Sequence, residues 1–388
     1  MLNGDRETTI RAVYVPDPAN RSDMTTDRTI PAEVRSRMVR AIDPTATVRE
    51  ATLADSGHLA VYHLVVDTPD GTDEWVLKAS PDGGRHGIGT EARILTIVDD
   101  RTSIPVPGVL GVVDEYESLP APFFVMERVE GEPVPKREIG ALSDGALERI
   151  ARESGRYLAE LHALEGPEGY GRVEVVPSTP LAGDRPAVDL DAVTVADLQG
   201  ASATDPTAWP AVLRTWTEET LERHASTRFG DLTGTVRPTV LEWIESMDGP
   251  FRPALGRIDH GLHNCIVEPE SGEITGLIDW AFTLSVPAAY DLVCVEANLS
   301  LGPWSVHPET PDRRELVRTS LLDGYRSRGS ADVLDRFHRH HDVYELLALC
   351  RAMNHLDRVP EFVMSGATDA QVDATATAYR DLVTASIS

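Results

Sequence analysis

The chain has 388 residues, of which 41% are hydrophobic, and its 63 acidic and 36 basic side chains give a formal net charge of −27. This length suits two domains or one large two-lobed domain, and the hydrophobic fraction is sufficient for a packed core. The excess of acid argues against a nucleic-acid surface, because phosphate backbones would be repelled. No apolar run reaches membrane-spanning length, so no membrane partner is expected.

Arginine supplies nearly all of the positive charge, since Lys78 and Lys136 are the only lysines. Acid-rich, lysine-poor composition is typical of proteins from a high-salt, halophilic cytoplasm, where salt screens the self-repulsion. A cationic substrate is the alternative explanation, so the global charge does not identify the substrate. The polar N-terminus does not have the pattern of a signal peptide. The three cysteines lie far apart, which favours a reduced, cytoplasmic location.

The first 130 residues predict a mostly antiparallel sheet with one inserted helix. Residues 1–29 form a polar lead-in, and Pro69-Asp70-Gly71 is a turn signal between two strands. A Gly-rich loop at 82–89 leads into the inserted helix, which Thr90 is expected to cap. Helices are expected at 31–42 and 90–98, and strands at 45–53, 58–66, 74–79, 109–115 and 123–128.

From about residue 129 the pattern changes to helical. Residues 129–133 indicate a hinge, and the stretch 165–203, rich in Gly, Pro, Asp and Val without a steady period, is expected to be irregular. Helices are expected at 142–164, 210–228, 238–246, 292–299, 313–328, 331–353 and 369–387.

The most informative segment lies between Arg257 and Trp280. Asp259 is followed five positions later by Asn264, then by two apolar runs separated by a turn, and the second run ends on Asp279. This pattern predicts a strand hairpin that brings two carboxylates and one amide to the same end. Phosphoryl transfer in the kinase style needs one acid to orient a hydroxyl, and an amide with a second acid to hold metal on the nucleotide phosphates.

Lys78 lies in the apolar, strand-like segment 74–79. An inward-facing lysine in a chain that otherwise uses arginine indicates a need for a compact ammonium group. The alternative is an edge-strand lysine whose ammonium group reaches water. The strand pattern alone leaves both open.

Together these residues resemble the aminoglycoside phosphotransferase family, which shares the protein-kinase-like fold with other small-molecule kinases. The resemblance covers roughly residues 45–300 and is most specific at 259–264, 276–280 and 289–292. It implies an α+β, two-lobed protein-kinase-like fold. The N-lobe would be an antiparallel-sheet, nucleotide-binding domain at residues 30–128. The C-lobe, 129–388, would be mainly helical and hold the catalytic loop and the substrate-binding helices.

The resemblance also assigns roles. Asp259 would be the catalytic acid that orients the acceptor hydroxyl, and Asn264 with Asp279 would hold Mg²⁺. Lys78 would contact the phosphates of ATP or GTP, held by an ion pair with Glu91, thirteen residues later in the inserted helix.

The remaining nucleotide contacts come from two loops. Ser56 and Gly57 would cover the phosphates, and the hinge that includes Glu127 and Val129 would bind adenine through its backbone. The reaction implied is transfer of the γ-phosphate to a hydroxyl group of a small molecule. The acceptor, the choice between ATP and GTP, and the oligomeric state are left open.

Three departures from the family pattern support an alternative. The usual His-Gly before the catalytic acid is Arg257-Ile258, the acid often found two positions after Asp279 is Ala281, and the usual Asp-Pro is replaced within 286–288. These changes bear on turnover rather than on fold. The alternative is a nucleotide-binding pseudokinase with a regulatory role; a protein kinase ranks lower, because no Ala-Pro-Glu segment is present.

Several other polar residues have structural interpretations. His260 and His263 lack an apparent third ligand, so a zinc site is not expected. Asp291 is expected to support the catalytic loop. Glu345 and Asp357 could bind an amine of the acceptor, although solvent-exposed acids on an acid-rich protein are the simpler interpretation.

Overall fold

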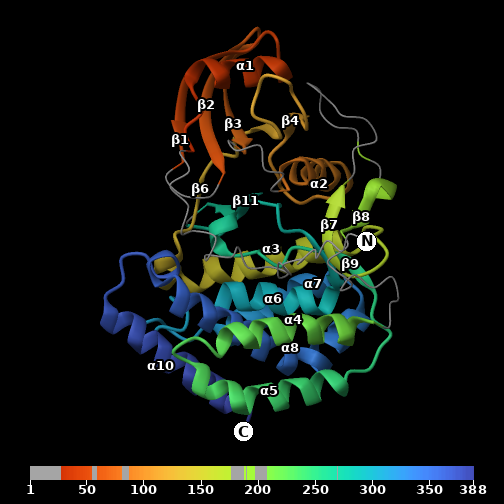
Figure 1. The fold of residues 1–388 in the computed structure, drawn as a ribbon, viewed down its shortest axis with the longest axis vertical. Helices are drawn as coiled ribbons and strands as arrows, with labels where there is room; N and C mark the ends of the chain where they lie inside the picture. Colours follow the sequence, from red (N-terminus) through yellow and green to blue (C-terminus); the bar gives the residue numbers. More distant parts are fainter. Residues whose placement is uncertain are drawn as a thin grey trace, which may run out of the picture.

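The computed structural model describes residues 28–54, 59–80, 87–175, 188, 190–196, 208–268 and 270–388. Nearly all of the predicted lead-in, most of the Gly-rich loop, and Ser56 and Gly57 lie outside these residues. Figure 1 shows a sheet-containing part stacked on a larger helical part. In the described part of the chain, no helix is both long and apolar enough to cross a membrane.

The sheet has five antiparallel strands in the order β1-β2-β3-β5-β4. Two helices accompany it, α1 before β1 and α2 between β3 and β4 (Figure 1). Every strand and helix predicted for this region is present. The elements are α1 (Ala32–Ile42), β1 (Thr47–Leu53), β2 (Ala60–Thr68), β3 (Gly71–Ala79), α2 (Ile88–Arg101), β4 (Val109–Val113) and β5 (Phe123–Glu127).

The two faces of this sheet bury different helices. In β5, Phe123 and Val125 pack in a cluster with α1, whereas Phe124 and Met126 pack in a second cluster with α2. This is the two-residue alternation expected of a strand covered on both faces. In β3, Val76 belongs to the α2 cluster, so the same alternation places Lys78 on the face that α2 covers.

The helical part is built around long helices. The predicted helices are all present, although their ends shift by several residues and one begins eight residues early. The helices are α3 (Asp144–His162), α4 (Trp209–His224), α5 (Gly230–Glu245), α6 (Ala288–Ser300), α7 (Arg314–Arg326), α8 (Ala331–Arg358), α9 (Pro360–Val363) and α10 (Asp369–Ser386).

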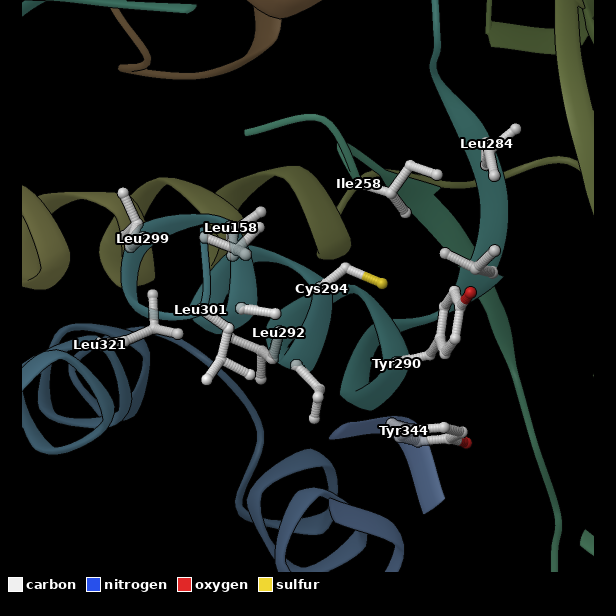
Figure 2. Packing of buried hydrophobic residues seen from close by; sticks show 14 of the residues in the cluster. Leu158, Ile258, Leu284, Tyr290, Leu292, Cys294, Leu299, Leu301, Leu321 and Tyr344 are labelled. Carbon is white, nitrogen blue, oxygen red and sulfur yellow. The ribbon is translucent and has the colours of Figure 1, made fainter. Parts of the chain in front are cut away.

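Two features fix the centre of this part. Figure 2 shows the buried side chains around α6, including Leu292 and Tyr290, which faces Tyr344 of α8. Helices α3 and α7 approach closely because Gly155 and Gly324 carry no side chain: a Cβ on either would lie 1.9 Å from a carbonyl oxygen of the other helix. α3 and α6 therefore form a rigid base for the loops above them.

Short strands connect the two parts. The predicted hairpin is present as β10 (Cys265–Val267) and β11 (Ile274–Leu277), and β6 (Glu132–Pro133) adds to it in the order β11-β10-β6. A four-stranded sheet, ordered β8-β7-β12-β9, flanks it. Its strands are β7 (Gly171–Val175), β8 (Val193–Val195), β9 (Pro253–Gly256) and β12 (Leu284–Pro287). The described residues also include the 3₁₀ turns η2 (Lys136–Ala141), η3 (Leu190–Ala192) and η4 (Leu262–Asn264).

Two helix starts and one loop were predicted wrongly. α2 begins at Ile88 after Gly87, whose φ of 78° only glycine adopts freely, so Thr90 is not its cap. α5 begins at Gly230 and continues through Pro238. The helix was predicted to start at residue 238, but the buried face of α5 already includes Thr233 and Val236 before Pro238. The stretch 165–203, expected to be irregular, contains β7 and β8.

Candidate active site

The loop after β9 brings Asp259 and Asn264 together. Asn264 is buried in η4, and its Nδ2 donates to the carbonyl oxygen of Asp259 at 2.9 Å and to the Asp259 carboxylate at 3.3 Å. The amide therefore fixes both the backbone and the side chain of the acid. Because it donates through nitrogen, its oxygen Oδ1 remains the atom suited to a cation.

Asp279 lies two positions after the last residue of β11, Leu277, and has a left-handed backbone, with φ of 59°. Asp tolerates this conformation better than most residues, but it is a strained one that recurs at functional sites. The side chain is 42% exposed, and its Oδ1 lies 3.2 Å from Lys78 Nζ. The Lys78 charge holds the pKa of Asp279 below its usual range, so this carboxylate is ionised and open to a ligand.

Lys78 and Glu91 form a buried ion pair between β3 and α2. The Lys78 Nζ is 2.8 Å from one carboxylate oxygen of Glu91 and 2.7 Å from the other, and the two side chains are 9% and 1% exposed. Burial alone would lower the pKa of Lys78, but the charges of Asp279 and Glu91 outweigh it and raise that pKa. Lys78 is therefore a fixed ammonium group that joins the sheet to the segment after β11, which carries Asp279.

Glu91 also contacts the chain beyond Asp279. Its Oε1 accepts a hydrogen bond from the backbone N–H of Trp280 at 3.2 Å. One carboxylate thus connects α2, β3 and the segment that carries the second acid. Lys78, Glu91, Asp259, Asn264 and Asp279, all selected from sequence, converge on one region of the fold.

Arg257 replaces the family's usual histidine, and the structure shows what it does instead. Its Nη2 donates to the carbonyl oxygens of Ile278 at 2.6 Å and Asn264 at 3.3 Å. Its guanidinium group lies 4.4 Å from the centre of the Trp280 ring. Burial lowers the pKa of Arg257, while nearby carboxylates act against that effect. Arg257 therefore ties the backbone before β10 to the backbone after β11.

Asp291 supports the same loop from below, as expected. Its Oδ2 accepts a hydrogen bond from the backbone N–H of Arg257 at 2.9 Å. The same oxygen lies 2.9 Å from Nε2 of His162 on α3. Both carboxylate and imidazole are buried. Through these contacts α3 and α6 hold the start of the loop that carries Asp259 and Asn264.

The two loop histidines differ in environment. His260 is buried, with Nε2 2.8 Å from Ser154 Oγ, whereas the Nε2 of His263 lies 3.7 Å from Asp259 Oδ1. Burial, followed by the charge of Arg257, lowers the pKa of His260 well below its usual value. His260 is thus a neutral, structural imidazole.

The low pKa values of buried histidines predict acid destabilisation. Burial lowers the pKa of His224, which is hydrogen-bonded to Thr233, from 6.5 to about 4. Between those values the unfolded chain binds protons that the folded chain does not, so stability is full above pH 6.5 and is lost as pH falls toward 4. We expect a loss on the order of 2 kcal/mol from this group. Urea denaturation at pH 7.5, 6 and 5, at constant salt, measures it.

A matched variant isolates this contribution. His224→Asn keeps a polar atom near Thr233 but cannot bind a proton, so its stability should change less with pH than that of the wild type. An unchanged pH dependence in the variant would show that His224 is not responsible.

One group elsewhere has the composition of a metal site. Glu296, His341 and Glu345 are the one such cluster found among the described residues. However, Arg318 already donates to Glu296 at 2.7 Å and to Glu345 at 3.0 Å. A guanidinium group supplies the positive charge there, so the cluster is explained as a buried ion-pair network.

Comparison with known proteins agrees with this geometry. The sequence model of the phosphotransferase enzyme family matches residues 50–330. The chain belongs to this family. Its Lys78, Glu91 and catalytic hairpin all lie within the matched segment, and the resemblance drawn from the sequence is confirmed.

Solved structures show the shared fold of this phosphotransferase family. A Ralstonia eutropha JMP134 protein described as a candidate aminoglycoside phosphotransferase has a TM-score of 0.58 at 15% identity, over 92% of this chain and 98% of that one. Aminoglycoside 2'-phosphotransferase-IIIa, in its GDP complex, has a TM-score of 0.53 at 14% identity, over 90% and 98%. APH(2")-IIia, solved with GDP and kanamycin, has a TM-score of 0.52 at 14% identity, over 91% and 97%. The predicted α+β, two-lobed, kinase-like fold is confirmed.

Two residues near the phosphotransferase site were missed or underrated from the sequence. Arg257 was treated as a departure, although it bonds both the backbone before β10 and the backbone after β11. Lys136, the second of only two lysines, was given no role, yet the charge of Asp259 acts on it. The signal was available: the scarcity of lysine that singled out Lys78 applied equally to Lys136.

Proposed function

We propose that this protein transfers the γ-phosphate of ATP or GTP, with Mg²⁺, to a hydroxyl group of a small molecule. The observation that carries the proposal is the position of Lys78, which contacts Glu91 and Asp279 at once. This arrangement connects the sheet to the catalytic hairpin. It supports the proposal because an ammonium group can bind phosphate oxygens directly, and an exposed carboxylate can bind them through a metal ion.

Each side chain of the site then has a defined role. Asp259 orients the acceptor hydroxyl and takes its proton on a carboxylate oxygen, while Asn264 holds that acid in place. Lys78 holds phosphate oxygens through Nζ. Asp279 and the Asn264 oxygen would hold Mg²⁺, since a hard cation prefers such ligands; when bound, Mg²⁺ neutralises phosphate charge.

The donor nucleotide is proposed to bind mainly to the N-lobe, residues 30–128, with the acceptor on the C-lobe, 129–388. At the hinge, Glu127 uses its backbone N–H to bond Gly108 at 2.8 Å, and Val129 packs against β11 where Gly276 leaves space. In the part of the chain that the structure describes, the N–H of Val129 has no partner, so it is suited to an adenine or guanine acceptor atom. The proposed phosphate contacts of Ser56 and Gly57 stay a prediction.

Thermal stabilisation by nucleotide tests the proposal. We expect ATP or GTP to raise the Tm of the wild type in high salt only when Mg²⁺ is present. The increase should be lost in Asp279→Ala and kept in Asp259→Ala, because only the first residue is proposed to hold the metal. A folded wild-type protein that responds to neither nucleotide would contradict the kinase activity.

A nucleotide-binding pseudokinase is the second candidate. It is favoured by Ala281, which is buried and offers no carboxylate two positions after Asp279. Both candidates predict Mg²⁺-dependent nucleotide binding. Phosphate transfer to a hydroxyl in the acceptor panel described below would exclude the pseudokinase.

A further inference from the structure

The charge around Asp259 is opposite to that of the protein as a whole. Lys136 begins η2 after the two residues that follow β6, and the pairing of β6 with β10 brings this turn close to the β10–β11 hairpin. Lys136 is half-buried, and Asp259 is the carboxylate of the described residues whose charge acts on it. The second lysine of the chain thus lies beside the acid proposed to receive the acceptor's proton.

Two arginines and one histidine lie around the same point, and burial lowers the pKa of the histidine, His355, to about 4, so it is neutral. Arg351 and His355 are four residues apart on α8, so they share one helix face, and Arg223 lies in the last turn of α4. Between Arg351 and His355, Asn354 donates to the Thr220 carbonyl oxygen of α4 at 3.0 Å. Lys136 Nζ lies 5.2 Å from the ring of Phe362 in α9, the helix that follows α8. The charges of Lys136 and Asp259 also act on His355. The set therefore converges from η2, α4 and α8 on the space beside Asp259.

The three cations of this set, Lys136, Arg223 and Arg351, lack acidic partners among the described residues. Lys136 Nζ lies 5.2 Å from the centre of the Phe362 ring, and the Arg351 guanidinium lies 5.6 Å from that of Tyr290. Over the described ranges, Lys136, Arg223 and Arg351 form no ion pair with a carboxylate. Arg351 is hydrogen-bonded to the neutral side chains of Tyr290 and Cys294. The absence of acidic partners is unusual in a chain where acids outnumber bases by 63 to 36, and it leaves these positive charges unmatched by an acid.

Glu345 and Asp357, the two acids that could have bound an amine of the acceptor, are each paired with an arginine of the chain. Glu345 is bonded to Arg318 at 3.0 Å, and Asp357 is bonded to Arg228 at 2.9 Å. Neither is available as a partner for a cationic acceptor. Phe362, 48% exposed beside Lys136, adds an apolar surface suited to the carbon skeleton of a small molecule.

We propose that the acceptor is an anionic small molecule, carrying a phosphate or carboxylate group besides the hydroxyl that is phosphorylated, and that Lys136, Arg351 and Arg223 bind this anion. This inference rests on the proposed phosphotransferase activity. In the reaction, the acceptor oxygen forms a bond to the γ-phosphorus as the bond from that phosphorus to the bridging oxygen breaks. The nucleoside diphosphate leaves with the electron pair, and the hydroxyl proton moves to Asp259.

The net negative charge of the protein gives a second reason why an anionic acceptor would need nearby cations. A net charge of −27 repels an anion, although high salt shortens the range of that repulsion to a few ångströms. The affinity for an anion must therefore come from cationic side chains in direct contact with it. A guanidinium fork and an ammonium group are the two side-chain types suited to phosphate and carboxylate.

A panel of hydroxyl compounds tests the proposal. The anionic members are glycerol 3-phosphate, D-glycerate, gluconate and glucose 6-phosphate; the neutral ones are glycerol and glucose; the cationic ones are choline, glucosamine and kanamycin. Transfer is followed by nucleoside diphosphate release and by ³¹P NMR of the product. Binding is followed by the Tm of the Mg²⁺–nucleotide complex. We expect the anionic members to react or bind best, with the phosphate and carboxylate arms showing which anion is preferred.

Variants connect the response to the residues. Lys136→Gln and Arg351→Gln should raise KM, or the concentration needed for stabilisation, at least tenfold for the anionic compound that responds. The Tm increase caused by nucleotide alone should not change. Arg137→Gln removes the same charge from the next residue, whose side chain is 66% exposed, and should behave like wild type.

Two results would overturn the anionic acceptor. One is that a neutral or cationic member responds at least as strongly as every anionic member. The absence of a response to every anionic member counts as the same result. The other is an anion response that Lys136→Gln and Arg351→Gln leave unchanged. Both can occur while Mg²⁺–nucleotide stabilisation persists, so failure of this inference is separable from failure of the proposed function.

Discussion

Asp259→Asn is expected to reduce phosphate transfer by about 10²–10⁴-fold, the contribution typical of a positioned general base. The variant keeps the size of the side chain and an oxygen within reach of Asn264, whose Nδ2 lies 3.3 Å from the wild-type carboxylate. It cannot take the proton of the hydroxyl. Nucleotide-dependent stabilisation should persist, because Lys78, Asn264 and Asp279 are unchanged. Steady-state kcat with the best acceptor of the panel, together with the Tm increase caused by Mg²⁺–ATP, measures both effects.

A control acid lies on the same hairpin. Glu270 is exposed in the turn between β10 and β11, and Glu270→Gln removes the same charge far from the catalytic end. We expect its kcat to stay within about twofold of wild type, as for most surface substitutions. If Asp259→Asn retained comparable activity, Asp259 could not be the group that receives the proton.

The parts of the site that were predictable from sequence depend on local patterns. Alternation along β3 determines which face Lys78 occupies, and α2 follows within the same stretch of chain. The strand pattern left the role of Lys78 open, and the pair with Glu91 was predicted from the family resemblance. The hairpin that carries Asn264 and Asp279 depends on a local pattern alone. Two apolar runs separated by a Gly-containing turn were enough to predict it.

The rest depends on contacts between distant segments. The bond from Arg257 to Ile278 spans 21 residues and exists only because the hairpin returns to the loop that precedes it. Lys136 reaches Asp259 through β6, a strand of two residues, which is too short to leave a periodic signal. Alternation and helical spacing report which face a residue occupies. They do not report which loop of another element will lie opposite it.

Arg257→Met is expected to lower the free energy of unfolding by about 2–4 kcal/mol. Methionine fills similar space but cannot donate a hydrogen bond, so the Ile278 carbonyl oxygen loses its 2.6 Å bond to the guanidinium group. The Asn264 carbonyl oxygen still accepts a hydrogen bond from the backbone N–H of Ile278 at 3.0 Å. The contact with Trp280 is also weakened. In addition, Arg257 is one of the charges that lower the pKa of Asp279, so the variant should hold Mg²⁺–nucleotide less tightly.

Two comparisons separate the bridging role of Arg257 from a general effect of losing an arginine. Arg152→Met removes an arginine that pairs with Glu148 four residues away on the exposed face of α3, and it should cost no more than about 0.5 kcal/mol. Arg257→Lys restores the charge without the planar fork and should recover only part of the stability. Urea denaturation gives the free energies, and the Tm increase with Mg²⁺–ATP gives the effect on the site. If Arg257→Met were as stable as Arg152→Met, the guanidinium would not be holding the two ends of the hairpin. The departure from the family's usual histidine would then carry no structural consequence. If instead stability and nucleotide response fell together, the arginine would be the means by which this chain keeps Asn264 and Asp279 in register.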